Sequence, residues 1–195
     1  KSGLSRRVKL GFGVGDMGGN LFFTAMGFYT LYYLTDVVGI NAALAGAAIL
    51  LGKFWDAVTD PMVGYLSDHT RPRWGRRRPY FLFGALPLLL SCWYFFSAPD
   101  FGGNQTVGFI WVTVVLCLLN TAYTVVNIPY GSLTPDLTKD FKERTTLNGY
   151  RFSFAVVGTV LGAAIVQPIV NLGGEPHRGF SIVGLIFGGV MAATI

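Results

Sequence analysis

The sequence predicts an all-α polytopic membrane protein, and three observations support this fold class. Hydrophobic residues make up 52% of the 195 positions and charged residues only 13%, against roughly 25% charged residues in an average soluble domain. Apolar stretches of about 20 residues, long enough to cross the hydrocarbon core of a bilayer as helices, recur along the chain. The charges gather between these stretches, so the net charge of +5 indicates membrane topology and not a nucleic-acid partner.

Six apolar stretches are expected to span the lipid bilayer, and together they predict one six-helix bundle over residues 1–195. The 26 glycines favour close packing of these helices, because small residues let helix backbones approach one another in a membrane. The predicted spans lie near residues 10–35, 42–66, 80–98, 107–131, 149–172 and 179–195.

Basic residues predict the orientation of the bundle. Segments 1–9, 67–79 and 132–148 hold most of the lysines and arginines, and five arginines lie in 67–79. The alternate connections 36–41 and 99–106 carry one aspartate each and no basic residue. Since cytoplasmic loops are enriched in Lys and Arg, the N-terminus is expected in the cytoplasm. A bacterial inner membrane is the expected location.

Enzyme chemistry is not expected. Cys92 and Cys117 both fall inside apolar runs, which does not suit a disulfide framework or a zinc site. His69 and His177 lie in predicted connections without nearby ligand residues, so no metal is assigned to them. The sequence therefore predicts no enzyme activity and no cofactor, and the one metal ion it leaves open is Na⁺.

The second span contains the most informative pattern, three ionisable residues within an apolar run. Offsets of three, four and seven residues place Lys53, Asp56 and Asp60 on one helix face. Each charge at a bilayer centre costs roughly 2.5–3.5 kcal/mol, so this face is expected to line a polar cavity. One lysine neutralises one aspartate, and the remaining carboxylate should take up a proton or a monovalent cation. A structural salt-bridge triad that fixes helix packing is the alternative.

The fourth span carries a polar stripe. Asn120, Thr124 and Asn127 follow one another at offsets of four and three, with Tyr123 beside them. Amide side chains both donate and accept hydrogen bonds, as sugar hydroxyls require. The stripe therefore suits a neutral polyol, although interhelical hydrogen bonds would use the same residues.

The first and fifth spans add polar residues near the cytoplasmic side. Asp16 and Asn20 lie one turn apart on one face of the first span, and Arg151 near the start of the fifth can extend its head group toward the membrane surface. Residues 13–18 match the dinucleotide fingerprint G-x-G-x-x-G, but an apolar span follows in place of a βαβ unit. These glycines therefore indicate close helix packing.

Several spaced motifs resemble known transporters. Residues 64–71, Gly-Tyr-Leu-Ser-Asp-His-Thr-Arg, and the arginine-rich run that follows are similar to the loop after the second span in the major facilitator superfamily. Five further motifs resemble its glycoside-pentoside-hexuronide:cation symporter family, and they lie at 33–39, 55–57, 60–61, 127–129 and 150–152. The resemblance runs from about residue 8 to 180. It corresponds to the N-terminal half of a member, so a second six-helix half is expected.

The resemblance implies symport of a sugar or glycoside, coupled to sodium or protons, by alternating access. It implies that Asp56 and Asp60 bind the coupling cation, with Thr124 adding an oxygen from the fourth span. Thr59 stands where the sodium site of the family has an asparagine, so Na⁺ and H⁺ both stay open as coupling ions. Lys53 is the charge partner of the two acids.

The resemblance also implies a solute site. Asn20, Asn127 and Arg151 fall at positions that the family uses around its sugar, and Tyr123 and Asp16 complete the candidate set as their neighbours. The expected ligand is a small glycoside or sugar.

Gating and two alternative functions complete the predictions. Asp68, with Arg71 and Arg76 of the basic loop, is expected to help hold one conformation closed. The first alternative is a non-transporting membrane scaffold subunit of a larger complex. The second is a symporter for a lipid-like or anionic solute, for which Arg151 would be the anchor.

Overall fold

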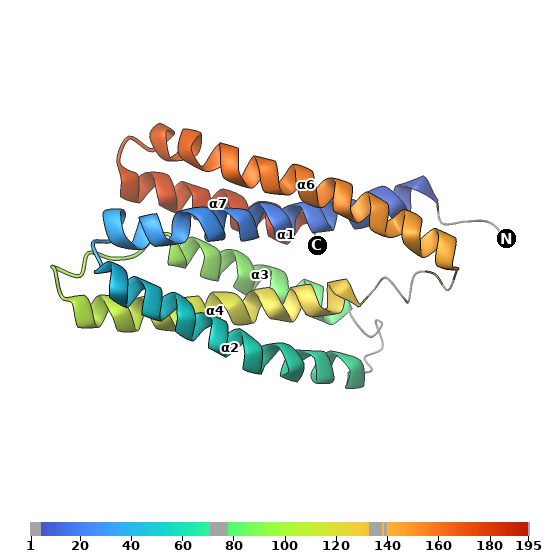
Figure 1. Cartoon of the computed structure of the whole chain (residues 1–195), viewed down its shortest axis with the longest axis horizontal. Helices are drawn as coiled ribbons and strands as arrows, with labels where there is room; N and C mark the ends of the chain where they lie inside the picture. The colour runs from blue at the N-terminus through green and yellow to red at the C-terminus, as the bar shows by residue number, and fades with distance from the viewer. Residues whose placement is uncertain (1–4, 71–77, 133–137, 139, 195) are drawn as a thin grey trace.

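The computed structural model describes residues 5–70, 78–132, 138 and 140–194, and these form a bundle of long helices (Figure 1). This part of the chain contains no strand, which confirms the predicted all-α class. The elements are α1 (Arg6–Tyr32), the π-helical turn η1 (Tyr33–Val37), α2 (Ala42–His69), α3 (Arg78–Phe95), α4 (Gln105–Gly131), α6 (Phe141–Leu172) and α7 (Pro176–Thr194).

Side-chain caps define where the long helices begin. Each cap accepts a hydrogen bond from a backbone N–H of the first helical turn, which would otherwise lack a partner. For α6 this start lies at Phe141, well before the apolar run that begins near residue 149. The helix is therefore longer than its apolar part. The capping residues of α1, α2, α4 and α6 are Ser5, Asn41, Asn104 and Asp140.

Three helices of the described ranges, α2, α4 and α6, are long and apolar enough to cross a membrane by length and composition. The apolar part of α3, Pro79–Phe95, is shorter. Glycines of α1 and α7, of which Gly18 and Gly184 lie close to neighbouring helices, contribute little hydropathy to these two segments. The six apolar stretches predicted from the sequence therefore differ in length and in hydropathy.

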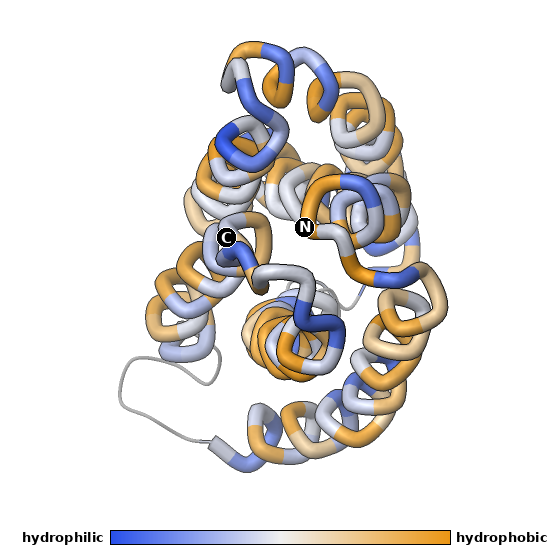
Figure 2. Tube along the Cα trace, turned by 90° about the vertical axis from the view of Figure 1, so that its left-hand side faces the viewer, coloured by the Kyte–Doolittle hydropathy of each residue, from blue (hydrophilic) through white to orange (hydrophobic). Residues whose placement is uncertain are grey.

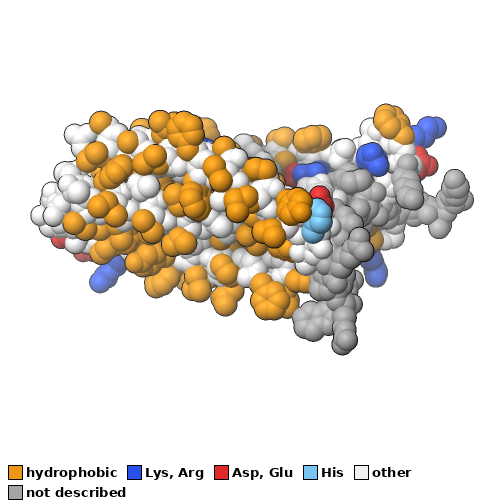
Figure 3. All heavy atoms as spheres, turned by 90° about the horizontal axis from the view of Figure 1, so that it is seen from below, with side chains coloured by type: hydrophobic (Ala, Val, Ile, Leu, Met, Phe, Trp, Pro, Cys, Tyr) orange, Lys and Arg blue, Asp and Glu red, His pale blue; other side chains and the backbone are white. Residues whose placement is uncertain are grey.

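The outer surface of the bundle is apolar. Large side chains of α2 such as Phe54, Met62 and Tyr65 are exposed, and apolar side chains cover much of the face in Figure 3. The view along the bundle in Figure 2 shows apolar positions on many sides of the helices. A soluble protein rarely exposes so much contiguous apolar surface, so this surface is suited to lipid.

The helices form two pairs joined by two further helices. α1 packs along α6, and α2 packs along α4, while α3 and α7 contact each other and connect the pairs (Figure 1). α1 and α2 hardly touch. The space between α1, α2 and α4 is where a cavity forms.

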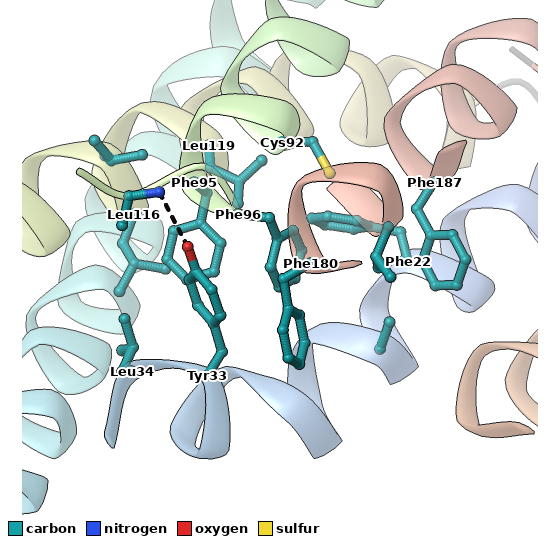
Figure 4. Packing of buried hydrophobic residues seen from close by; sticks show 14 of the residues in the cluster. Phe22, Tyr33, Leu34, Cys92, Phe95, Phe96, Leu116, Leu119, Phe180 and Phe187 are labelled. Atoms are coloured by element: carbon teal, nitrogen blue, oxygen red, sulfur yellow. Dashed lines mark hydrogen bonds between the residues drawn. The ribbon is translucent and has the colours of Figure 1, made fainter. Parts of the chain in front are cut away.

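An aromatic cluster fixes the end of α1 against α3 and α7. Tyr33 is fully buried among Phe95, Phe96 and Phe180, with ring centroids 4.9–5.8 Å from its own (Figure 4). Its hydroxyl oxygen accepts a hydrogen bond from the backbone N–H of Ala98 at 3.0 Å. This cluster holds in place the helix that forms the apolar wall of the cavity.

Glycines bring α6 into backbone contact with α1. A Cβ on Gly158 would collide with the carbonyl of Met17, and one on Gly162 would collide with the carbonyl of Leu21. We expect Gly162→Val to push the two helices apart and to lower the free energy of unfolding by about 1–3 kcal/mol. A lower midpoint of thermal unfolding in detergent would show this.

The matched control is Gly149→Val on the same helix, because Gly149 has open space around it. Both variants place a β-branched residue in α6. An equal loss of stability in the two would mean that helix propensity, and not the contact with α1, causes the effect.

Candidate functional site

A cavity of about 630 Å³ opens between α1, α2 and α4. α1 supplies an apolar wall that includes Phe22, Phe23 and Met26, whereas α2 and α4 supply charged, hydroxyl and amide groups. The cavity exists because α1 and α2 diverge while both remain anchored to other helices. The acids of α2 therefore face a hollow lined by protein.

Lys53, Asp56 and Asp60 all line this cavity, in agreement with their predicted helix face. Lys53 Nζ lies 3.0 Å from Asp56 Oδ2. Among the described residues Lys53 forms no ion pair with Asp60. The second oxygen of Asp56, Oδ1, is buried and accepts no hydrogen bond from any described residue. One acid is therefore paired through a single oxygen.

Asp60 is held from α4. Thr124 is buried, and its hydroxyl donates a hydrogen bond of 2.8 Å to Asp60 Oδ1. The hydroxyl of Thr59 instead donates to the carbonyl of Trp55 in its own helix, at 3.1 Å, and Thr59 is absent from the described lining of the cavity. The structure thus brings Thr124 to the acids and turns Thr59 away from them.

A second, smaller cavity of about 100 Å³ lies beside the first. Tyr123 and Asn127 line both cavities, whereas Asp16 and Asn20 line only the smaller one. At about 30 Å³ per water molecule the smaller space suits a few waters and not a sugar. Four of the predicted solute residues therefore line the smaller cavity, and two of these four also line the larger one.

Arg151 is engaged within the bundle. Its Nη2 donates to Asp16 Oδ1 at 2.9 Å, and its guanidinium lies 5.5 Å from the ring centroids of both Phe12 and Tyr130. Its Nε is buried without a hydrogen-bond partner among the described residues, and Arg151 is not in the described lining of either cavity. Asn20 donates to the backbone carbonyl of Asp16. The Asp16–Arg151 pair therefore links α1 to α6.

The predicted gating residues are placed only in part. Asp68 is exposed near the end of α2 and interacts with another residue. Arg71 and Arg76 lie outside the described residues, so their gating role stays a prediction.

Asn120, a member of the polar stripe predicted on the fourth span, lines the large cavity. Its side-chain nitrogen donates to the carbonyl of Gly52 at 3.2 Å, which ties α4 to α2. Its position four residues before Thr124 was the available signal. Phe23, the apolar residue facing Lys53, gave no such signal, because it is one of many apolar residues in its span.

The side-chain oxygens of this site have the chemistry of ligands for a hard cation. Within the described ranges no group of three or more His, Cys, Asp or Glu is arranged to hold a metal ion. Two carboxylates and one hydroxyl from Asp56, Asp60 and Thr124 offer oxygens, which hard cations prefer. Because Asp56 Oδ1 is buried and unpartnered, a ligand that binds it directly would satisfy it.

A polytopic bundle with charged residues around an internal cavity defines the class of membrane transporters. The chain matches the model of the family described as MFS/sugar transport protein over residues 11–195. It belongs to the glycoside-pentoside-hexuronide:cation symporter family of the major facilitator superfamily, as its motifs predicted. It is therefore an integral membrane protein of a transporter family and not an enzyme.

Three relatives show the range of this similarity. The chain is 38% identical to an inner membrane symporter, YicJ, of Escherichia coli, over 93% of this chain and 39% of the relative. It is 33% identical to the isoprimeverose transporter of Lactiplantibacillus pentosus, over 91% and 38%. It is 34% identical to the sodium-dependent lysophosphatidylcholine symporter 1 of Mus musculus, over 90% and 34%. The chain thus spans less than two fifths of the length of these relatives.

Proposed function

We propose that this chain forms the cation-binding and solute-binding half of a symporter that carries a sugar or glycoside together with Na⁺ or H⁺. The observation that carries the proposal is the pairing in one cavity of two acids with a single lysine. The three charges sum to −1, and a bound monovalent cation brings the sum to zero. The symporter relatives support this assignment.

Coupling follows if the charge state of the cavity changes which conformation is favoured. A half-buried carboxylate without a counter-ion is costly in a low-dielectric interior. Filling the site therefore changes the relative free energies of the inward-facing and outward-facing states, which is all that coupling requires. One charge that moves down a potential of about 100 mV releases about 2.3 kcal/mol, enough to concentrate a neutral solute about 50-fold.

The solute is expected in the large cavity. Asn120 and Asn127 can each donate and accept hydrogen bonds, and Lys53 adds three donors. Alternating access would occur between this bundle and a second six-helix half, with the N-terminus in the cytoplasm and the protein in a bacterial inner membrane.

The apolar wall favours a second candidate function. Phe22, Phe23 and Met26 present no hydrogen-bonding group, so the same cavity suits the chain of an amphiphilic solute. One relative is named for lysophosphatidylcholine. Transport of a lipid-like solute is therefore the alternative that the lining supports.

Flux measurements in proteoliposomes test the proposal. The complete protein is reconstituted, and uptake of a labelled glycoside is measured with an inward Na⁺ gradient, with an inward proton gradient, and with neither. Stimulation by one gradient supports symport. Gradient-stimulated uptake of labelled lysophosphatidylcholine without uptake of the glycoside would select the lipid-like candidate, and transport of neither solute would reject both.

A further inference from the structure

Lys53 is the one lysine or arginine among the described residues that line the large cavity. Its Nζ lies 3.0 Å from Asp56 Oδ2 and 5.4 Å from the centroid of the Phe23 ring on α1. Its side chain is nevertheless 56% exposed, compared with 20% for Asp56. The ammonium of Lys53 therefore contacts one carboxylate oxygen and one aromatic ring. The rest of the side chain is largely exposed to the cavity, so the ammonium has room to move.

The carboxylate of Asp56 is satisfied on one side only. Oδ2 accepts from the lysine, while Oδ1 is buried and has no hydrogen-bond partner in the described part of the chain. Buried polar atoms are nearly always partnered. One oxygen of this carboxylate thus lacks a protein partner, as expected where a lysine occupies only part of a site that also receives a cation.

We propose that Lys53 is a tethered competitor of the coupling cation: its ammonium occupies Asp56 when the site is empty of ion, and cation binding displaces it into the solute cavity. This inference rests on the proposed function, because it requires a coupling cation.

Electrostatic repulsion between the bound cation and the ammonium of Lys53 drives the displacement of the lysine. A cation that binds both Asp56 and Asp60 sits within a few ångströms of the ammonium, and two positive charges this close repel each other strongly at the effective dielectric of a half-buried site. The lysine is covalently attached, so its local concentration at Asp56 is high whatever the ion concentration outside. The coupling cation must therefore outcompete it.

Displacement connects the ion to the solute. An ammonium on Asp56 has one of its donors engaged, whereas a displaced ammonium in the cavity can offer its donors to solute oxygens. Cation binding thus increases the number of groups available to the solute. By linkage, solute binding must in return raise cation affinity by the same factor.

Cation affinity in variants of Lys53 and Phe23 tests the inference. With the complete protein in nanodiscs, Na⁺ binding is measured by isothermal titration calorimetry, and proton uptake with a pH indicator in weakly buffered solution. Lys53→Gln removes the competitor and is expected to tighten cation binding about tenfold or more. Lys142→Gln, at an exposed lysine of α6 that is not in the described lining of either cavity, is the matched control, with affinity equal to that of the wild type.

Phe23→Leu provides a second, milder variant. It keeps an apolar wall but removes the ring that stabilises the ammonium at its site. Weakening the competitor should tighten cation binding about two- to fivefold. Leu is tolerated in apolar helices, so Phe23→Leu is expected to fold. It therefore tests the competitor role of Lys53 even if Lys53→Gln does not fold.

A separate readout distinguishes a competitor from a structural ion pair. In the wild type the affinity for a glycoside should rise when the cation is present, and in Lys53→Gln this dependence should disappear. Unchanged or weaker cation binding in folded Lys53→Gln, or in Phe23→Leu, would overturn the inference and leave the proposed function intact. A wild-type protein that binds neither Na⁺ nor H⁺ would overturn both.

Discussion

Asp60→Asn is expected to abolish cation-dependent solute uptake while the protein stays folded. The substitution is nearly isosteric, and an amide oxygen can still accept the hydrogen bond from Thr124. Among the described lining residues it removes the negative charge that Lys53 does not pair, so the remaining Lys53–Asp56 pair is neutral without any ion. Proteoliposome uptake under Na⁺ and proton gradients measures the loss, and size-exclusion chromatography checks the fold.

Asp36→Asn is the matched control for this experiment. Asp36 is exposed in the π-helical turn after α1, where its carboxylate interacts with the adjacent Thr35 and not with the cavity. Its uptake should equal that of the wild type. Retention of fully coupled transport by Asp60→Asn would contradict the assignment of the cation site.

Arg151→Gln is expected to destabilise the bundle by about 3–5 kcal/mol, because it leaves the mostly buried carboxylate of Asp16 without its ion-pair partner. The double variant Asp16→Asn/Arg151→Gln removes both charges and should recover most of this loss. Thermal unfolding in nanodiscs measures both. Arg144→Gln, an exposed arginine on the same helix, is the control and should change the unfolding midpoint little.

The double variant also separates a structural role from a solute-binding role. If Arg151 only joins α1 to α6, the rescued protein should transport its solute normally. If its predicted role at the solute is correct, stability returns but solute affinity does not. Failure of the double variant to regain stability would show that the pair is not the main interaction of either residue.

The fold class, the family and the charged face of the second span could be predicted from local sequence patterns. The composition and the apolar stretches indicated a helical membrane protein, and the family motifs were confirmed by comparison with known transporters. The common helix face of Lys53, Asp56 and Asp60 followed from offsets of three, four and seven, because these depend only on the geometry of one helix. The helix starts were less predictable, because a cap such as Asp140 can begin a helix before the apolar run.

Helix packing decided the rest. The rotation of each helix determines which polar side chains share a space, and local patterns along one helix do not reveal the distances between helices. Asn120 therefore faces the large cavity, Thr59 donates to the carbonyl of an earlier residue of α2, and Arg151 forms an ion pair with Asp16. The sequence by itself determined a lipid-embedded bundle with a charged face on α2. Only the tertiary structure decided that this face lines a cavity, because α2 packs along α4 and α1 packs along α6, so that α1 and α2 hardly touch.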